Sequence, residues 1–172
     1  MTRTALLIAA ASALAISAPA VAAGPTDPQI AHIAYTAGNL DVAAGKQALK
    51  MSHNAAVRAF AQEMVRDHTA VNQKALALVK KFHVTPEANP TSTGLTKAAD
   101  AERAKLSKLK GAAFDREYVN NEVAYHKTVN GALASTLIPS AHNAELKSLL
   151  QTGLTLFKEH QAHAEQLAAK LK

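Results

Sequence analysis

The sequence contains no cysteine and no tryptophan, and aromatic residues make up only 4% of its 172 residues. Without cysteine there is no disulfide, no thiolate nucleophile and no cysteine-ligated metal, so histidine, aspartate and glutamate are the strong ligand candidates. The scarcity of aromatic residues, with no stripe that mixes them with basic residues, argues against stacking on nucleic-acid bases. These absences leave imidazoles and carboxylates as the carriers of chemistry.

Charge of either sign is also not concentrated anywhere along the chain. The formal net charge is +6, from 19 Lys and Arg against 13 Asp and Glu. The lysines are scattered along every predicted helix, which is typical of solvated helix faces. We therefore expect no nucleic-acid partner, and only weak attraction to anionic components of the cell envelope.

No apolar run reaches the roughly 20 residues that a helix needs to span a bilayer. The most apolar stretch, residues 5–18, follows Arg3 and precedes Ala20-Val21-Ala22, a small-x-small pattern that signal peptidase accepts. We expect residues 1–23 to be a signal peptide cleaved after Ala22 or Ala23. Residues 24–172 are then expected to form a single exported, periplasmic domain without a transmembrane segment.

Apolar residues recur every three or four positions after this segment, and alanine is abundant, as in amphipathic helices. The pattern predicts long helices over 27–51, 55–82, 112–137 and 143–171, and a short charged helix over 95–109. The segment 84–94, which contains Pro86 and Pro90, is expected to be a loop. Pro139 is expected to separate the last two long helices.

The connections between these helices predict how they are arranged. Two joints are short, but 29 residues separate Phe82 from Ala112. Four long helices with one long middle connection describe an all-α, ferritin-like four-helix bundle with a single crossover that carries a short extra helix. An up-down-up-down bundle would require a short middle connection.

Polar residues interrupt the apolar face of each long helix near its midpoint. His68, His126 and His160 each interrupt the apolar face of a different predicted helix. Asp41 does the same on the first long helix, and Glu122 lies one turn before His126. Mid-helix residues of an antiparallel bundle share one layer. Because each unsatisfied buried polar group costs about 1–3 kcal/mol, the set must bond to itself, to water or to a metal ion.

The candidate metal ligands are therefore His68, His126, His160, Asp41 and Glu122. A set rich in histidine suits one Zn, Cu or Ni ion, and His163, at the edge of the last apolar face, is a candidate fourth imidazole. The Glu-x-x-His pairs of di-iron bundles do not occur in the sequence, which argues against ferroxidase or oxygenase chemistry. An ion-pair network without any metal fits the same pattern.

Four segments carry a resemblance to a known family: GNLDVAAGKQAL (38–49), FAQEMVRDHTAVN (60–72), LSKLKGAAFDREYVNNEVAYHKTV (106–129) and NAELKSLLQTGLTLFKEHQAHAEQLA (143–168). They resemble a domain-of-unknown-function family of ferritin-like bacterial exported proteins, often labelled outer membrane proteins. The resemblance implies a bundle in the periplasm or envelope. It implies no catalytic residue, since no activity is established for the family. Many members carry Asp before the histidine of the third long helix, where this chain has Tyr125, and Glu122 is then the substitute carboxylate.

Two classes of function remain after the common catalytic motifs are searched for. The sequence has no glycine-rich phosphate loop, no Gly-x-Ser-x-Gly elbow and no His-Glu-x-x-His helix. One class is a binding module that holds a metal ion in the histidine layer. The other is a structural or stress-related envelope protein whose polar layer only fixes helix packing. An enzyme is supported only by the clustering of ionisable groups.

Overall fold

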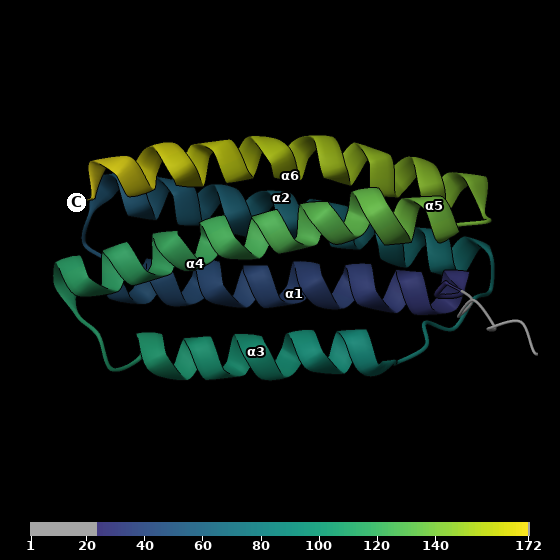
Figure 1. Cartoon of the computed structure of the whole chain (residues 1–172), viewed down its shortest axis with the longest axis horizontal. Coiled ribbons are helices and arrows are strands. Elements are labelled where there is room, and N and C mark those ends of the chain that lie inside the picture. The colour runs from purple at the N-terminus through teal and green to yellow at the C-terminus, as the bar shows by residue number, and fades with distance from the viewer. Residues whose placement is uncertain (1–23, 172) are drawn as a thin grey trace, which may run out of the picture.

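The computed structural model describes residues 24–171, and all of its regular elements are helices (Figure 1). The predicted signal peptide, residues 1–23, lies outside the described residues. The elements in chain order are α1 (Asp27–Met51), α2 (Ala55–Lys81), α3 (Pro90–Leu106), α4 (Gly111–Ala132), the π-helical turn η1 (Leu133–Leu137), α5 (Ile138–Ser140) and α6 (Ala144–Lys170). The all-α prediction is confirmed.

The four long helices α1, α2, α4 and α6 form a bundle, and α3 lies along its outside against α1 and α4 (Figure 1). Helices α1 and α2 are antiparallel neighbours, as are α4 and α6. Because α3 returns along the length of the bundle, α2 and α4 run in the same direction. The predicted single crossover with an extra helix is therefore confirmed, and the up-down-up-down alternative is wrong. A relationship to ferritins stays a prediction.

The short joints are explained by asparagine caps. The side chain of Asn54 accepts hydrogen bonds from the backbone N–H of Ala56 at 2.9 Å and of Val57 at 3.3 Å. Asn143 does the same for the first turn of α6, at 3.0 Å from Glu145 and Leu146. Each cap satisfies N–H groups that have no partner inside the helix. Both helices can therefore begin directly after a tight turn.

The crossover helix starts earlier than the sequence analysis predicted. We expected a loop to Gly94 and a helix over 95–109, whereas α3 begins at Pro90 and ends at Leu106. The Asn89 side chain accepts from the Ser92 N–H at 3.0 Å, and the Ser92 hydroxyl lies 3.2 Å from the Asn89 N–H. This reciprocal cap, followed by a proline at the first helical position, starts the helix.

The fourth long helix is not continuous to Leu137 as predicted. It changes at Leu133 into the π-helical turn η1, which is followed by α5. Pro139 was expected to break the chain here, but it lies in the first turn of α5, where the missing N–H of proline costs little. Single π turns accommodate an extra residue and often occur near functional sites.

Helices α1 and α2 approach closely at two glycines of α1, where a Cβ atom would require neighbouring atoms to move. A Cβ atom on Gly38 would lie 2.2 Å from Oδ1 of Asn72, and one on Gly45 would lie 2.9 Å from Cγ2 of Val65. Asp41 lies between these two glycines, one turn from each. The close approach therefore brings the Asp41 carboxylate against the middle of α2.

The buried apolar residues form two clusters separated by the polar layer. One cluster contains Phe60, Met64, Phe114 and Tyr118, towards the Ser52–Asn54 turn. The other contains Ile33, Leu133, Leu150 and Phe157, towards the opposite end. Asp41, His68, His126 and His160 lie in sequence between the members of both clusters. The polar groups thus occupy the middle of the bundle, as the periodicity predicted.

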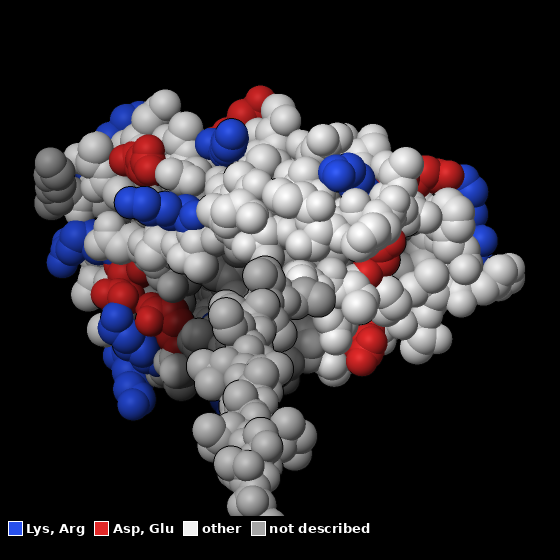
Figure 2. Space-filling model, turned by 45° about the vertical axis from the view of Figure 1, so that its right-hand side comes forward, with Lys and Arg blue, Asp and Glu red and all other residues white. Residues whose placement is uncertain are grey.

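Charged side chains are scattered over the surface. On the face shown in Figure 2, basic and acidic residues occur in small groups of both signs with uncharged surface between them. This agrees with the solvated faces expected from the dispersed lysines. Within residues 24–171, none of the helices combines the length and the apolar character needed to cross a bilayer.

Candidate metal centre

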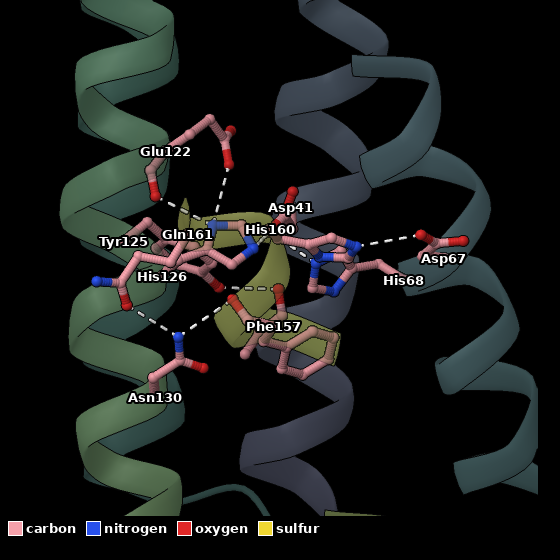
Figure 3. A network of polar contacts seen from close by, with 11 residues as sticks. Asp41, Asp67, His68, Glu122, Tyr125, His126, Asn130, Phe157, His160 and Gln161 are labelled. Carbon is pink, nitrogen blue, oxygen red and sulfur yellow. Dashed lines mark hydrogen bonds and ion pairs between the residues drawn. The ribbon is translucent and has the colours of Figure 1, made fainter. Parts of the chain in front are cut away.

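Three imidazoles meet in the middle of the bundle, one each from α2, α4 and α6 (Figure 3). The ring centroids of His68 and His160 are 5.3 Å apart, those of His126 and His160 5.5 Å, and those of His68 and His126 5.6 Å. Each of these histidines is at most 3% exposed. The predicted convergence of the three rings is confirmed, and one nitrogen of each ring lies within 4.8 Å of the others.

The carboxylate of Asp41 enters this group from α1. Its Oδ2 atom lies 3.1 Å from Nε2 of His68 and 3.5 Å from Nε2 of His126. Asp41 is 2% exposed, so it is shielded from solvent. All four long helices therefore contribute to one buried group of three imidazoles and one carboxylate.

Hydrogen bonds on the outer side of two rings determine which nitrogen faces inward. Nδ1 of His126 lies 3.0 Å from the carbonyl oxygen of Glu122, which can only accept, so Nδ1 carries the proton. Nε2 of His160 lies 3.1 Å from Oδ2 of Asp67 and donates to that carboxylate. In the neutral rings, Nε2 of His126 and Nδ1 of His160 then hold their lone pairs free.

The inward-facing atoms lack hydrogen-bond partners among the described residues. They include both carboxylate oxygens of Asp41, both ring nitrogens of His68, Nε2 of His126 and Nδ1 of His160. Buried polar atoms of folded proteins are nearly always paired, and leaving one unpaired costs about 1–3 kcal/mol. A neutral His68 ring has one N–H, which can be directed to Oδ2 of Asp41 at 3.1 Å, but the other inward-facing atoms are acceptors, so this group calls for a cation or for further hydrogen-bond donors.

Burial keeps the imidazoles of His126 and His160 neutral. It lowers the pKa of His126 to about 4, with the charge of His68 acting in the same direction and that of Asp41 opposing it. Burial and the charge of His68 also lower the pKa of His160, although Asp67 acts against this. Since a metal-ligating imidazole must be deprotonated, rings with depressed pKa values are ready to bind a metal near neutral pH.

The two buried carboxyl groups differ in protonation. Burial acts to raise the pKa of Asp41, but the interactions with His68, His126 and His160 outweigh it, and the net pKa is lowered. For Glu122, burial and the nearby charge of Asp41 both act to raise the pKa, which lies well above its usual value. Asp41 is therefore the ionised carboxylate of the layer, and Glu122 holds a proton.

Glu122 and Asp41 approach different nitrogens of the His126 ring. The Oε2 atom of Glu122 is 3.5 Å from Nδ1 of His126, whereas Asp41 approaches Nε2. Sequence analysis grouped Glu122 with the other candidates because it lies one turn from His126. The structure brings it to the layer, where one oxygen of Glu122, one oxygen of Asp41 and one nitrogen of His126 lie within 4.8 Å of one another.

The expectation that His163 is a fourth imidazole is wrong. Its side chain is 46% exposed, and Nδ1 lies 2.7 Å from Oε2 of Glu63 at the surface. Its ring packs edge-on against Phe60 at 5.1 Å. Because His163 follows His160 by less than one full turn of α6, its ring points away from the layer and towards Glu63 of α2.

Sequence analysis missed the role of Asp67. Asp67 lies beside His68 in the chain but faces His160 of α6, and Arg66 holds the same carboxylate at 2.6 Å. The hydrogen bond from Arg66 is the largest cause of the lowered pKa of Asp67, and His160 contributes to it. The only sequence signal was its place in the Asp67-His68 pair, since the partner helix cannot be read from one helix alone.

A small cavity of about 240 Å³ between α1, α3 and α4 reaches the carboxylates of the layer. Asp41 and Glu122 line its inner end, and Glu102 and Arg103 of α3 line the outer part. Burial raises the pKa of Glu102. The cavity gives the buried layer a route towards the surface beneath α3.

By its fold and its buried layer, the protein is a helical bundle with a central histidine–carboxylate cluster. A family model matches residues 11–167, which is most of the chain, and the chain belongs to that family, the Domain of unknown function DUF4142. A search of curated proteins gave no match.

Among solved structures, the fold is similar to the crystal structure of a DUF305 protein from Streptomyces coelicolor that is described as secreted. The TM-score is 0.71 at 12% sequence identity, over 83% of this chain and 91% of that one. At this identity the likeness supports the helical-bundle fold alone.

Proposed function

We propose that this protein is an exported binding module that holds one divalent metal ion in its central layer. His68, His126 and His160 are the imidazole ligands, and Asp41 is the fourth ligand. Glu122 and Asp67 lie outside the ligand set. The observation that carries the proposal is the group of buried, inward-facing polar atoms from all four long helices, most of them acceptors, whose one close contact within the described residues is that of Asp41 with His68.

The spacing of these atoms suits a tetrahedral ion. Ligand atoms at about 2.0–2.1 Å from a tetrahedral zinc are about 3.3 Å from one another. Asp41 Oδ2 lies 3.1 Å from one histidine nitrogen and 3.5 Å from another. The three imidazole nitrogens lie within 4.8 Å of one another, so small rotations of the rings would close the set.

The outer hydrogen bonds of the histidines also favour a metal site. Metal-ligating histidines typically donate their second N–H to a carboxylate or a backbone carbonyl, which fixes the ring and its tautomer. His160 donates in this way to Asp67, and His126 donates to the carbonyl of Glu122. Both rings are thereby oriented with a lone pair towards the layer.

The ligand chemistry favours a single zinc, copper or nickel ion over a di-iron centre. Three imidazoles and one carboxylate suit these ions, whereas di-iron bundles use mostly carboxylates. Because Glu122 is protonated, it adds no charge to the ligand set. Bound metal would then have a net +1 charge with Asp41, and the cavity beneath α3 would offer it a route to the layer.

The proposal includes export to the periplasm. It is supported by the signal pattern in residues 1–23 and by the likeness to a DUF305 protein described as secreted. An outer-membrane location and contacts with other envelope components have no support beyond the sequence resemblance. The alternative, a structural protein whose polar layer only fixes helix packing, predicts no response to metal.

Thermal unfolding of metal-free protein and two matched variants tests the ligand set. A bound ion raises stability by mass action, by about 2.7 kcal/mol at a hundredfold excess over its dissociation constant. Zn²⁺, Cu²⁺, Ni²⁺ and Fe²⁺ are added in turn to wild type, His126→Ala and His53→Ala, the last in an exposed turn. We expect at least one ion to stabilise wild type and His53→Ala but not His126→Ala. Equal responses in all three proteins would contradict the ligand set, and no response in any would favour the structural alternative.

A further inference from the structure

A second, larger cavity opens on the other side of the histidine layer. Its volume is about 510 Å³, and it lies among α1, α2, α4 and α6, in the half of the bundle that contains η1. Protein interiors are close-packed, with few voids larger than a water molecule. Cavities of about 300–1,000 Å³ are instead the size of small-molecule binding sites. A cavity of this size within a bundle therefore requires an explanation.

The cavity exists because small residues face it. Ala37 and Gly38 of α1, Ala75 of α2, Ala132 of α4 and Gly153 of α6 all contribute to its wall. These positions have no side chain long enough to reach the opposite helix. The remaining wall is mainly apolar and contains branched side chains such as Val71, Leu133 and Leu150.

No charged side chain lines this cavity. Among the described lining residues there is no Lys, Arg, Asp or Glu. The polar groups are few, and at the inner end they are the imidazoles of His68 and His126, beside Tyr125 and Asn72. The Tyr125 hydroxyl is already engaged, since it donates to the carbonyl of Ala37 at 2.8 Å. Such a wall favours an uncharged molecule, because a buried charge would find no partner of opposite sign there.

The irregular end of α4 forms part of the wall. Leu133, Thr136 and Leu137 belong to the π-helical turn η1, and all three line the cavity. A π turn shifts the residues after it relative to a regular α-helix, and such turns are frequent at functional sites. The π turn and the cavity are two separate observations, and they occur at the same place in the bundle.

The mouth of the cavity lies near the start of α3. Pro25 and Gln29 contribute from one side, and Asn89, Pro90 and Thr91 contribute from the other. Pro90 and Thr91 are exposed. A molecule could therefore enter between the first turn of α1 and the first turn of α3, and reach the histidines at the inner end.

We propose that this cavity binds an uncharged, predominantly apolar small molecule. The molecule would contact the walls from α2, α4 and α6, where burial of its surface drives binding. This inference goes beyond the metal proposal and does not require an ion, because the apolar wall alone supplies most of the contact.

The probe for this inference is N-phenyl-1-naphthylamine, which is uncharged, apolar and carries one N–H donor. Its fluorescence should rise and saturate with metal-free wild-type protein. Ala75→Leu and Ala132→Leu, each of which fills part of the cavity, should weaken its binding at least about tenfold, since a blocked site loses more than about 1.4 kcal/mol of contact. Ala77→Leu, the same change at an exposed position of α2, should bind the probe like wild type.

Two results would overturn the inference. One is the absence of a saturable rise in probe fluorescence with the wild-type protein. The other is equal probe affinity in the cavity-filling variants and in Ala77→Leu, when all of these variants show wild-type helicity. Two filling variants on different helices are used so that a failure of one to fold leaves the other as a test. His160→Ala, at a proposed metal ligand that does not line this cavity, should lose the metal response but keep the probe affinity. The metal proposal and the cavity proposal can therefore fail separately.

Discussion

A histidine in an apolar layer is stable only if it is neutral or paired, and His126 is both. It is 1% exposed, it donates to the Glu122 carbonyl, and its inner nitrogen faces Asp41. Burial outweighs the attraction of Asp41, so its pKa falls to about 4. The same depression that avoids a buried positive charge leaves a lone pair available for a metal.

The protonation of His126 makes folding sensitive to acid. The unfolded chain takes up a proton at His126 near pH 6.5, whereas the folded chain does so only near pH 4. The unfolded state therefore binds more protons in this window, and the stability that His126 contributes is lost as the pH falls from 6.5 to 4, by roughly 3 kcal/mol. Metal-free wild type should lose more stability over this range than His126→Gln, measured by urea unfolding. NMR titration of the histidine ring protons would contradict the account if the His126 signal titrates above about pH 6.

The stability that Glu122 contributes depends on pH in the opposite direction. Its raised pKa means that the folded chain holds a proton which the unfolded chain releases as the pH rises above 4.5. Its contribution to stability is thus present at low pH and lost as the pH rises. Glu122→Gln, which is neutral at every pH, should gain stability relative to wild type between pH 5 and pH 8, measured by urea unfolding. Metal affinity should be unchanged, as it should be in the exposed control Glu159→Gln. A loss of metal affinity in Glu122→Gln alone would place Glu122 among the ligands.

The sequence was sufficient to predict which histidines lie in the core but not how each ring is oriented. His68, His126 and His160 repeat the apolar period of their own helices, which one sequence reveals. The partner of His160 is Asp67 on another helix, and that pairing depends on how α2 and α6 are rotated against each other. His163 lies only three residues after His160, so a small rotation decides between the layer and the surface.

At the scale of elements, α3 is the helix whose bounds were predicted least well. The Asn89-Pro90-Thr91-Ser92 segment contains an N-cap residue, a proline at the first helical position and a serine at the third. These residues also occur in loops, and the segment 84–94 is predicted to be a loop because it contains Pro86, Pro90 and several Thr and Ser residues. The π turn η1 has no comparable signal in the sequence, since Leu133–Leu137 continues the apolar period of the preceding helix.

The cap of α3 can be tested by removing it. Asn89→Ala loses the hydrogen bond to the Ser92 N–H, which should cost about 1 kcal/mol. Because α3 packs on the outside of the bundle, the loss should appear mainly as faster hydrogen exchange over residues 90–106. The exposed control Asn120→Ala should leave that exchange unchanged. Equal exchange in Asn89→Ala and wild type would contradict the role of the cap.

At the scale of the whole molecule, the chain combines a predicted export signal with a bundle that surrounds a polar centre. We expect the exported protein to begin at Ala23 or Gly24 and to be recovered in the soluble periplasmic fraction. The reason is that residues 5–18 are apolar but too short to span a bilayer, which needs about 20 residues. Intact-mass measurement after expression of the full chain checks this. Retention of Arg3 in the exported protein would contradict the predicted cleavage.

The most direct test of the central claim is the metal content of the protein itself. The tag-free protein is purified from the periplasm without chelator and analysed by elemental analysis and native mass spectrometry. Because one set of four ligands binds one ion, the account predicts about one equivalent of a divalent metal per chain, lost in His126→Ala and retained in His53→Ala. No bound metal in the wild type, even after incubation with Zn²⁺, Cu²⁺, Ni²⁺ and Fe²⁺, would contradict it.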